Sequence, residues 1–278
     1  MLKKVAVSHQ QFEQAMGAAI GAFNLGRMEA ATVICEGILR GNSNDPAAHQ
    51  LLAVICLRQQ NASDAHHHIM CSLKIRPDHV PSLIAAGKIA LARQDLNAAL
   101  AFFENATVLA PEALEPAYLI GSVLLEQGKL AAAVNAFVQL VHLHPSHASA
   151  WCSLGTALQQ AGMKDKAGDA LEKAIALDPR QADAWFNLGL VRQDKGELAG
   201  AAAALRAALQ QRPDFVEAAV NLGIVLQANG FMDEAMNAYR TAYQLRSNTF
   251  GRIANALASR PHGRMWTDLG RLRQLLAV

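Results

Sequence analysis

The chain has 278 residues, of which 52% are hydrophobic and only 5% aromatic, and its formal net charge is +2. A charge this close to zero gives no general attraction to nucleic acid or to an anionic membrane, so we expect neither a nucleic-acid partner nor membrane insertion. No stretch approaches 18 uncharged apolar residues, and the alanine-rich segment 198–209 carries Arg206 and is too short to span a bilayer.

From the N-terminal sequence and the spacing of the cysteines we expect a cytoplasmic protein. The start, MLKKVAVSHQ, has two lysines but no long apolar run behind them, so it is a poor signal peptide. The cysteines lack the paired spacing of a metal-binding or redox motif, which favours reduced thiols. They are Cys35, Cys56, Cys71 and Cys152.

Residue types recur at a spacing of 34 residues along most of the chain, in one common register. Such a recurrence is the sequence signature of a stacked repeat protein. The recurring residues are Pro77, Pro111, Pro145, Pro179 and Pro213; Gly87, Gly121, Gly155, Gly189 and Gly223; Gly128, Gly162, Gly196 and Gly230; and Ala31, Ala65, Ala99, Ala133, Ala167, Ala201 and Ala235. They divide the chain into seven units, which are 12–45, 46–79, 80–113, 114–147, 148–181, 182–215 and 216–249.

Each unit is predicted to be a pair of helices, A and B. A small residue at position 8 and alanine at position 20 let the helices approach closely, and a bulky residue at position 24 fills the space between them. Glycine at position 15 permits the positive φ that closes the first helix. Proline at position 32 ends the second helix, and an acidic residue or serine is expected to start the next one; these are Asp78, Glu112, Ser146 and Asp214.

The two ends of the chain depart from this register. Residues 1–11 are expected to be an N-terminal extension, and unit 12–45 is degenerate. Residues 250–278 are expected to form C-terminal capping helices, one over Phe250–Ser259 and one over Arg264–Ala277 that includes Trp266. The alternative for the last helix is that it docks on another domain.

The clearest unit, 148–181, carries the motif that relates the chain to a known family. It has Trp151, Leu154-Gly155, Gly162, Ala167, Leu171, Ala174 and Pro179 at positions 4, 7–8, 15, 20, 24, 27 and 32. With this motif the chain resembles the tetratricopeptide repeat family over about residues 12–249. The resemblance implies an all-α, right-handed superhelical solenoid in which the A helices line a concave groove, and it implies binding of a peptide or partner segment there.

The helical period places positions 2, 6, 9 and 13 of each A helix opposite the core, with positions 5 and 12 at one edge. In the first four units this face is largely apolar, with Met16, Ile20, Phe23, Val54, Leu57, Ile84, Lys88, Leu91, Tyr118, Leu119 and Leu125. In the last three it is polar, with Ser153, Thr156, Gln159, Gln160, Asn187, Gln193, Asp194, Asn221 and Gln227. We expect the apolar residues to be exposed and to bind a partner, or else to be covered by residues 1–11 or by a second copy of the chain.

Asn187 and Asn221 both occupy position 6, one repeat apart. A side-chain amide offers a donor and an acceptor, so the two could clamp the backbone of an extended peptide. Side-chain pockets are expected around Tyr118, Leu119, Leu125 and Phe186. The pair is similar to the asparagine ladder in the repeats of O-linked N-acetylglucosamine transferases, and this similarity implies the alternative that the chain is the targeting region of a bacterial glycosyltransferase or methyltransferase.

No residues form a recognisable catalytic constellation or cofactor motif, so we expect a non-enzymatic protein without a cofactor. The carboxylate clamp of chaperone-binding relatives is not matched, because Lys88 and Arg58 lack the remaining members. His67 and Cys71 are spaced to share one helix face, but two ligands are too few for a metal ion, so no metal is expected. The sequence therefore predicts a scaffold or adaptor that binds an extended segment of an unidentified protein, with self-association as a further alternative.

Overall fold

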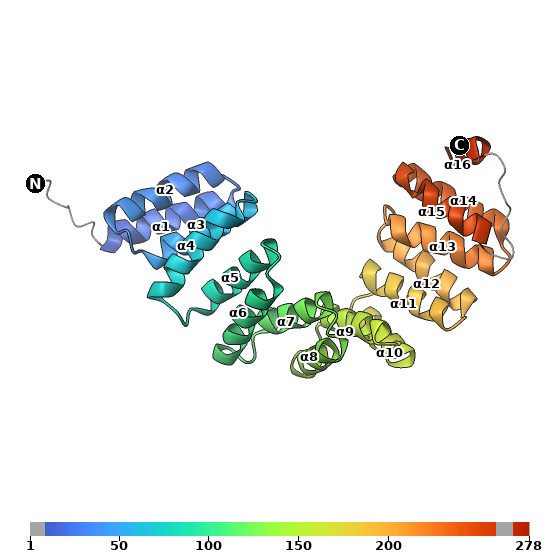
Figure 1. Ribbon diagram of the computed structural model, residues 1–278, viewed down its shortest axis with the longest axis horizontal. Coiled ribbons are helices and arrows are strands. Elements are labelled where there is room, and N and C mark those ends of the chain that lie inside the picture. The colour runs from blue at the N-terminus through green and yellow to red at the C-terminus, as the bar shows by residue number, and fades with distance from the viewer. Residues whose placement is uncertain (1–8, 260–268, 278) are drawn as a thin grey trace, which may run out of the picture. The chain divides into compact units, whose positions relative to one another are not determined.

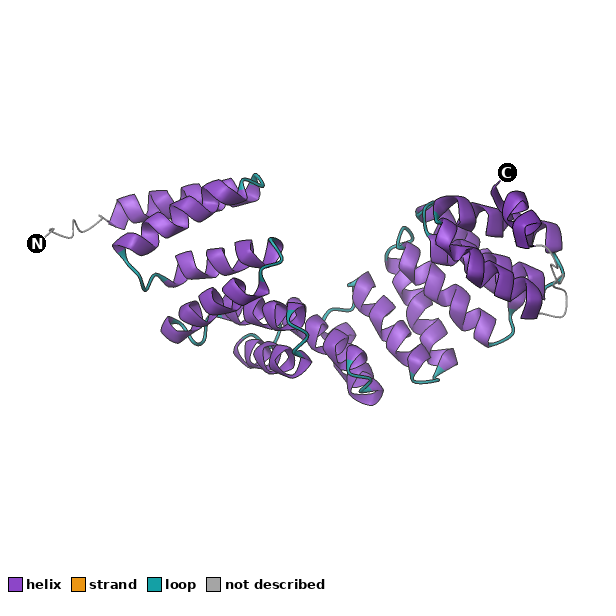
Figure 2. Cartoon of the chain, turned by 45° about the horizontal axis from the view of Figure 1, so that its top comes forward, coloured by secondary structure: helices purple, strands orange, loops and turns teal. Residues whose placement is uncertain are grey.

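The computed structural model describes residues 9–259 and 269–277, and within these ranges the chain is helical apart from turns, without strands (Figures 1 and 2). The expected all-α class is confirmed. The helices are α1 (His9–Asn24), α2 (Met28–Gly41), α3 (Pro46–Arg58), α4 (Ala62–Ile75), α5 (Val80–Ala92), α6 (Leu96–Leu109), α7 (Leu114–Glu126), α8 (Leu130–Leu143), α9 (Ala148–Gln160), α10 (Lys164–Leu177), α11 (Ala182–Asp194), α12 (Leu198–Gln211), α13 (Val216–Ala228), α14 (Met232–Leu245), α15 (Phe250–Ser259) and α16 (Leu269–Ala277). None of these described helices is both long and apolar enough to cross a membrane.

The chain forms two compact units, Met1–Lys129 and Leu130–Val278. The first contains α1 to α7 and the second α8 to α16. Consecutive helices lie side by side and run back and forth from α1 to α7 in the first unit and from α8 to α14 in the second (Figure 1). We refer to the odd-numbered helices α1 to α13 as A helices and to the even-numbered helices α2 to α14 as B helices.

The core of four of the pairs is built on a contact between a glycine of the A helix and a large side chain of the B helix, whereas the first two pairs have Ala19 and Ala53 in place of the glycine. A Cβ atom added to Gly155 would lie 2.5 Å from Cγ of Leu171, and one added to Gly189 would lie 2.8 Å from Cγ of Leu205. Both leucines are fully buried. Only glycine therefore lets the B-helix side chain lie directly on the A-helix backbone. The same contact joins Gly87 to Phe103 and Gly223 to Tyr239.

The alanines at position 20 complete this core. Each has no exposed surface, as expected for a helix crossing at close range. They are Ala31, Ala65, Ala99, Ala133, Ala167, Ala201 and Ala235.

The turn within each pair requires one residue whose backbone adopts the left-handed conformation, with positive φ. The glycines expected there do adopt positive φ, as Gly128 (70°) and Gly162 (77°) illustrate. Gln60 and Gln94 take the same conformation, with φ values of 62° and 61°, although a side chain is unfavourable in this region. The packing of the two helices therefore imposes the turn even where glycine is missing.

The starts of the A helices differ from expectation in one detail. The residue after each repeat proline does not cap the next helix, because the cap lies one position later. The N-cap of α5 is His79, not Asp78, and that of α9 is His147, whose side chain accepts a hydrogen bond from the Ala150 amide. The acidic and serine residues instead lie in the turn between pairs.

Successive pairs in the second unit are tied together by two tryptophans. The indole Nε1 of Trp151 donates to the carbonyl oxygen of Pro145 at 2.9 Å, and that of Trp185 donates to Pro179 at 2.9 Å. Each bond joins an A helix to the proline turn that precedes it.

The end of the chain covers the last pair. Helix α15 occupies the expected range Phe250–Ser259 and packs against α13, and its Ile253 and Leu257 are buried. Helix α16 packs against α14 through buried Leu272 and Leu276. The part of the expected last helix that holds Arg264 and Trp266 lies outside the described residues. At the other end, α1 begins at His9, so the expected extension 1–11 overlaps it.

A histidine pair joins α3 to α4, and no pattern in the sequence indicates it. The Nδ1 atoms of His49 and His68 lie 3.0 Å apart, and Nε2 of His49 is 3.1 Å from the carbonyl oxygen of Ser43. A carbonyl only accepts, so Nε2 of His49 carries a proton, and Nδ1 of neutral His49 accepts from Nδ1–H of His68. At most one of the two rings can be cationic while this bond persists.

The surroundings of His68 disfavour its charged form. Burial is the largest cause, followed by His49 and His67, and together they lower the pKa of His68 below its ordinary value of 6.5 despite the opposing charges of Asp64 and Glu36. Burial also lowers the pKa of His66 and that of His79.

We expect Gly155→Ala to lower the free energy of unfolding by about 1–3 kcal/mol, because the added methyl group overpacks the contact with Leu171. Gly168→Ala, in the same repeat, meets only Val191 at 4.0 Å and should be neutral or stabilising by about 0.5–1 kcal/mol. Urea and thermal unfolding followed by circular dichroism measure both. Equal effects of the two substitutions would contradict this view of the core.

We expect the stability to fall as the pH is lowered from 7 to 5. A lowered folded-state pKa means that the unfolded chain binds more protons in this range, so the stabilisation is complete above 6.5 and is lost as the pH falls toward the folded-state pKa. His68→Asn keeps a donor near the Nδ1 position but does not titrate, so it should reduce the drop in thermal midpoint. The exposed His142→Asn serves as the control. A drop of the same size in His68→Asn and in the wild type would refute the assignment.

Candidate functional site

The A-helix face of the first unit is not the exposed apolar surface that the sequence predicts. Val54, Leu57 and Ile84 are half-buried and pack against a core cluster around Ile69. Leu91 and Leu119 likewise pack against a cluster that contains Phe103. These side chains belong largely to the contacts between neighbouring helices, because each A helix is wedged between the helices of the adjacent repeats. Tyr118 and Leu125 are also half-buried, while Ile20 on α1 remains 45% exposed.

Lys88 on this face is already paired. Its Nζ lies 2.6 Å from Oε1 of Glu115, so an ion pair connects α5 to α7. Both side chains are about half exposed, and such a surface pair contributes roughly 0–1 kcal/mol. The charge of Lys88 is therefore balanced within the protein.

The polar face of the second unit is cross-linked between A helices. Nδ2 of Asn187 on α11 donates to Oγ1 of Thr156 on α9 at 3.0 Å. Nε2 of Gln159 reaches Oδ2 of Asp194 at 3.3 Å, again from α9 to α11. These amides therefore use their donors inside the protein, in bonds that also fix their orientation.

The side-chain donor of Asn221 on α13 is also used inside the protein, in a hydrogen bond within its own helix. Its Nδ2 donates to the carbonyl oxygen of Glu217, one turn earlier in the same helix, at 2.7 Å. Across the described residues, Oδ1 of neither Asn187 nor Asn221 accepts a hydrogen bond. Both side chains are half-buried. The two asparagines thus present acceptors, rather than the donor–acceptor pair that the sequence suggests.

Gln193 and Gln227 occupy equivalent positions in successive repeats but differ in environment. Oε1 of Gln193 is buried and has no hydrogen-bond partner among the described residues. Gln227 is fully buried, donates to the Ala256 carbonyl at 3.0 Å, and accepts from the Tyr239 hydroxyl at 2.9 Å. The expectation that Gln227 lines the groove is therefore wrong, because α15 covers it and it joins the core of the last pair.

Phe186 and Ser153 complete the predicted set. The Phe186 ring lies 4.8 Å from that of Phe215, and the Arg212 guanidinium lies 4.5 Å from the centre of the Phe215 ring. Phe186 therefore forms part of a small aromatic cluster at the start of α13. Ser153 is half-buried on α9. We call the polar residues Ser153, Thr156, Gln159, Asn187, Gln193 and Asn221 the A-helix polar face.

Cysteines and histidines provide no metal centre in the described part of the chain. No group of three His, Cys, Asp or Glu side chains is close enough to hold an ion there. Sγ of Cys71 and Nε2 of His67 lie 3.9 Å apart on α4, the pair that their spacing predicts. Cys152 is buried beneath Asn187, and burial raises the pKa of its thiol to about 11, so the thiol stays protonated.

Comparison with known proteins supports the repeat assignment. A tetratricopeptide repeat family model matches residues 118–182, 152–214 and 186–248. A search of curated proteins found no match.

Solved structures share the fold. A crystal structure of MamA is 27% identical, with a TM-score of 0.54, and the match covers 59% of this chain and 95% of that one. YrrB, described as a TPR protein with an unusual peptide-binding site, is 22% identical over 66% of this chain and 95% of its own, with a TM-score of 0.54. PilF of Pseudomonas aeruginosa is 17% identical over 74% of this chain and 94% of its own, with a TM-score of 0.64. The family model and these structures thus agree that residues 118–248 are similar to tetratricopeptide repeats.

Proposed function

We propose that this protein is a non-catalytic interaction scaffold that binds an extended segment of a partner protein on the A-helix polar face. The observation that carries the proposal is a set of amide oxygens on α11 and α13 that have no hydrogen-bond partner among the residues that the structure describes. They belong to Asn187, Gln193 and Asn221. A buried or half-buried acceptor that lacks a donor is unfavourable, so a ligand that supplies donors gains free energy there.

The donors that suit these oxygens are the backbone amides of an extended peptide. The N–H groups of such a peptide recur at regular intervals whatever its side chains are. Because Thr156 and the Glu217 carbonyl hold the nitrogen end of each asparagine, the oxygen ends are oriented before the peptide arrives. Pre-orientation lowers the entropy lost on binding.

The comparisons support this proposal at the level of fold. Tetratricopeptide repeats are widely used as protein-interaction modules, and YrrB is described as having a peptide-binding site. Since YrrB is 22% identical, its likeness supports the architecture, and the binding proposal rests on the residues of this chain.

The targeting region of a glycosyltransferase or methyltransferase is the second candidate. It is motivated by Asn187 and Asn221 at equivalent positions in successive repeats. Co-purification of a transferase with the tagged protein from its native cells would favour this role, and a preparation without one would count against it.

The proposal is tested with peptides selected on the wild-type protein from a displayed library of random 12-residue sequences. We expect Asn187→Ala with Asn221→Ala to weaken the selected peptides roughly 5- to 100-fold, since each lost hydrogen bond is worth about 0.5–1.5 kcal/mol. Fluorescence polarisation of labelled peptide measures the affinity. Unchanged affinity for every selected peptide would remove the A-helix polar face as the binding site.

Two control variants sharpen the result. Asn105→Ala removes an exposed asparagine from a B helix of the first unit and should leave the affinity unchanged. Asn187→Asp keeps the acceptor oxygens, and the Thr156 hydroxyl can turn from the Cys152 carbonyl to donate to one of them, so this variant should bind nearly as well as the wild type. If Asn187→Asp is as weak as Asn187→Ala, Asn187 acts as a donor and the acceptor mechanism is wrong.

A further inference from the structure

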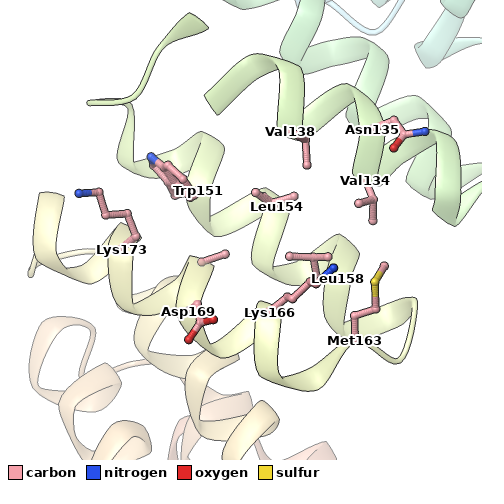
Figure 3. Close-up of a pocket in the computed structure, with 11 residues that line it drawn as sticks. Val134, Asn135, Val138, Trp151, Leu154, Leu158, Met163, Lys166, Asp169 and Lys173 are labelled. Carbon is pink, nitrogen blue, oxygen red and sulfur yellow. The ribbon is translucent and has the colours of Figure 1, made fainter. Parts of the chain in front are cut away.

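The B helices of the second unit enclose an open groove that the function proposed above does not use. It lies between α8 and α10, with α9 as its floor, and has a volume of about 670 Å³ (Figure 3). The floor is apolar and includes Trp151, Leu154 and Leu158. Val138 on the α8 wall is 47% exposed, and Met163 at one end is 36% exposed.

The next groove along the array, between α10 and α12, is closed. Arg192 rises from α11 and lies 3.0 Å from Oε1 of Glu172 on α10 and 3.5 Å from the Gly200 carbonyl on α12. Lys195 adds ion pairs to Asp165 at 2.9 Å and to Glu197 at 3.0 Å. Only about 130 Å³ remains open there.

None of the charged residues that span the groove between α10 and α12 has a charged counterpart in the open groove. Thirty-four residues before Arg192, Lys195 and Glu172 the chain has Leu158, Ala161 and Val138. Helix α8 contains no Asp, Glu, Lys or Arg, so it cannot form an ion pair with α10. Farther along, Arg206 and Glu234 join α12 to α14. The groove between α8 and α10 is thus open because of its own side chains, whereas charged side chains span the groove between α10 and α12.

The rim of the groove is positively charged on one side. Lys166 and Lys173 lie seven residues apart on the same face of α10, with Asp169 between them. Figure 3 shows all three beside the apolar floor of α9. None of the three takes part in an ion pair within the described chain. The opposite wall is uncharged, so the rim carries a net charge of one positive unit, and this charge lies on α10.

We infer that this groove docks an amphipathic helix of a partner protein, with its apolar stripe on α9 and its acidic flank facing Lys166 and Lys173. A partner helix docked between α8 and α10 would bury apolar residues spaced three and four apart along one face. Such a row matches the apolar floor, which runs along α9 from Trp151 to Leu158 and ends at Met163. Carboxylates toward α10 complement the two lysines, and a basic flank would be repelled there. The inference concerns the B helices and does not depend on the A-helix polar face.

The probe is a labelled 16-residue helical peptide with a leucine stripe and glutamates on both flanks, compared with the same peptide carrying lysines in place of the glutamates. We expect the glutamate peptide to bind the wild-type protein at least about tenfold more tightly than the lysine peptide at low salt, with the difference shrinking as salt is added. Lys166→Glu with Lys173→Glu should reverse the preference. Arg27→Glu with Arg252→Glu changes the net charge equally at exposed positions away from the groove and should not reverse it.

A second variant closes the groove with residues that the protein already uses. Val138→Glu with Leu158→Arg copies the Glu172–Arg192 pair one repeat earlier and should abolish binding of the glutamate peptide while the far-ultraviolet circular dichroism stays unchanged. Were the closing variant not to fold, the two lysine substitutions would still decide the question, because they lie on the surface.

Four outcomes would overturn the inference. One is the absence of binding to the wild type at millimolar peptide, and another is equal binding of the two peptides. A third is affinity that survives both the closing variant and Lys166→Glu with Lys173→Glu. The fourth is a wild-type dimer in sedimentation that the closing variant converts to a monomer, since a second copy of the chain would then occupy the groove.

Discussion

The contact on which this fold depends is the one between the glycine at position 8 of an A helix and the large side chain at position 24 of its B helix. Without a Cβ, Gly155 and Gly189 let Leu171 and Leu205 lie directly on the helix backbone. The leucines are fully buried, so the contact fixes the separation of the two helices. Because the contact recurs at a spacing of 34 residues from Gly155 through Gly189 to Gly223, these successive pairs acquire the same geometry and can stack.

Features that depend on chemistry inside one repeat could be predicted from the sequence. Helix class, the position of the glycine turns and the range of α15 all follow from local patterns that the structure confirms. Local patterns do not predict the turns at Gln60 and Gln94, because these residues adopt the left-handed conformation without being glycine. The packed helices on either side stabilise the turn by more than the roughly 1–2 kcal/mol that a side chain costs there.

Side chains whose partners come from another repeat could not be predicted from the sequence. Gln159, Gln193 and Gln227 share position 12, yet the first meets Asp194, the second has an acceptor without a partner, and the third is buried. The difference comes from the A helix or capping helix of the next pair along the chain. Beyond the pair α13 and α14 that helix is α15, and its Ala256 carbonyl accepts from Gln227. The exposed apolar face predicted for the first A helices differs from the structure for the same reason, since neighbouring helices partly bury Leu57, Ile84 and Leu91.

The core residues of the repeats carry little information about what the protein binds. Every repeat has alanine at position 20, a small residue at position 8 and a fully buried side chain at position 24, because these positions set the distance between the two helices of a pair. Positions 11 and 14 differ between the two grooves compared above, with Leu158 and Ala161 in one repeat and Arg192 and Lys195 in the next. Arg192 and Lys195 close one groove, and Leu158 and Ala161 leave the preceding one open at no cost to the glycine contact beneath it. The side chains that line a groove can therefore differ from one repeat to the next while the contact that sets the helix spacing stays the same.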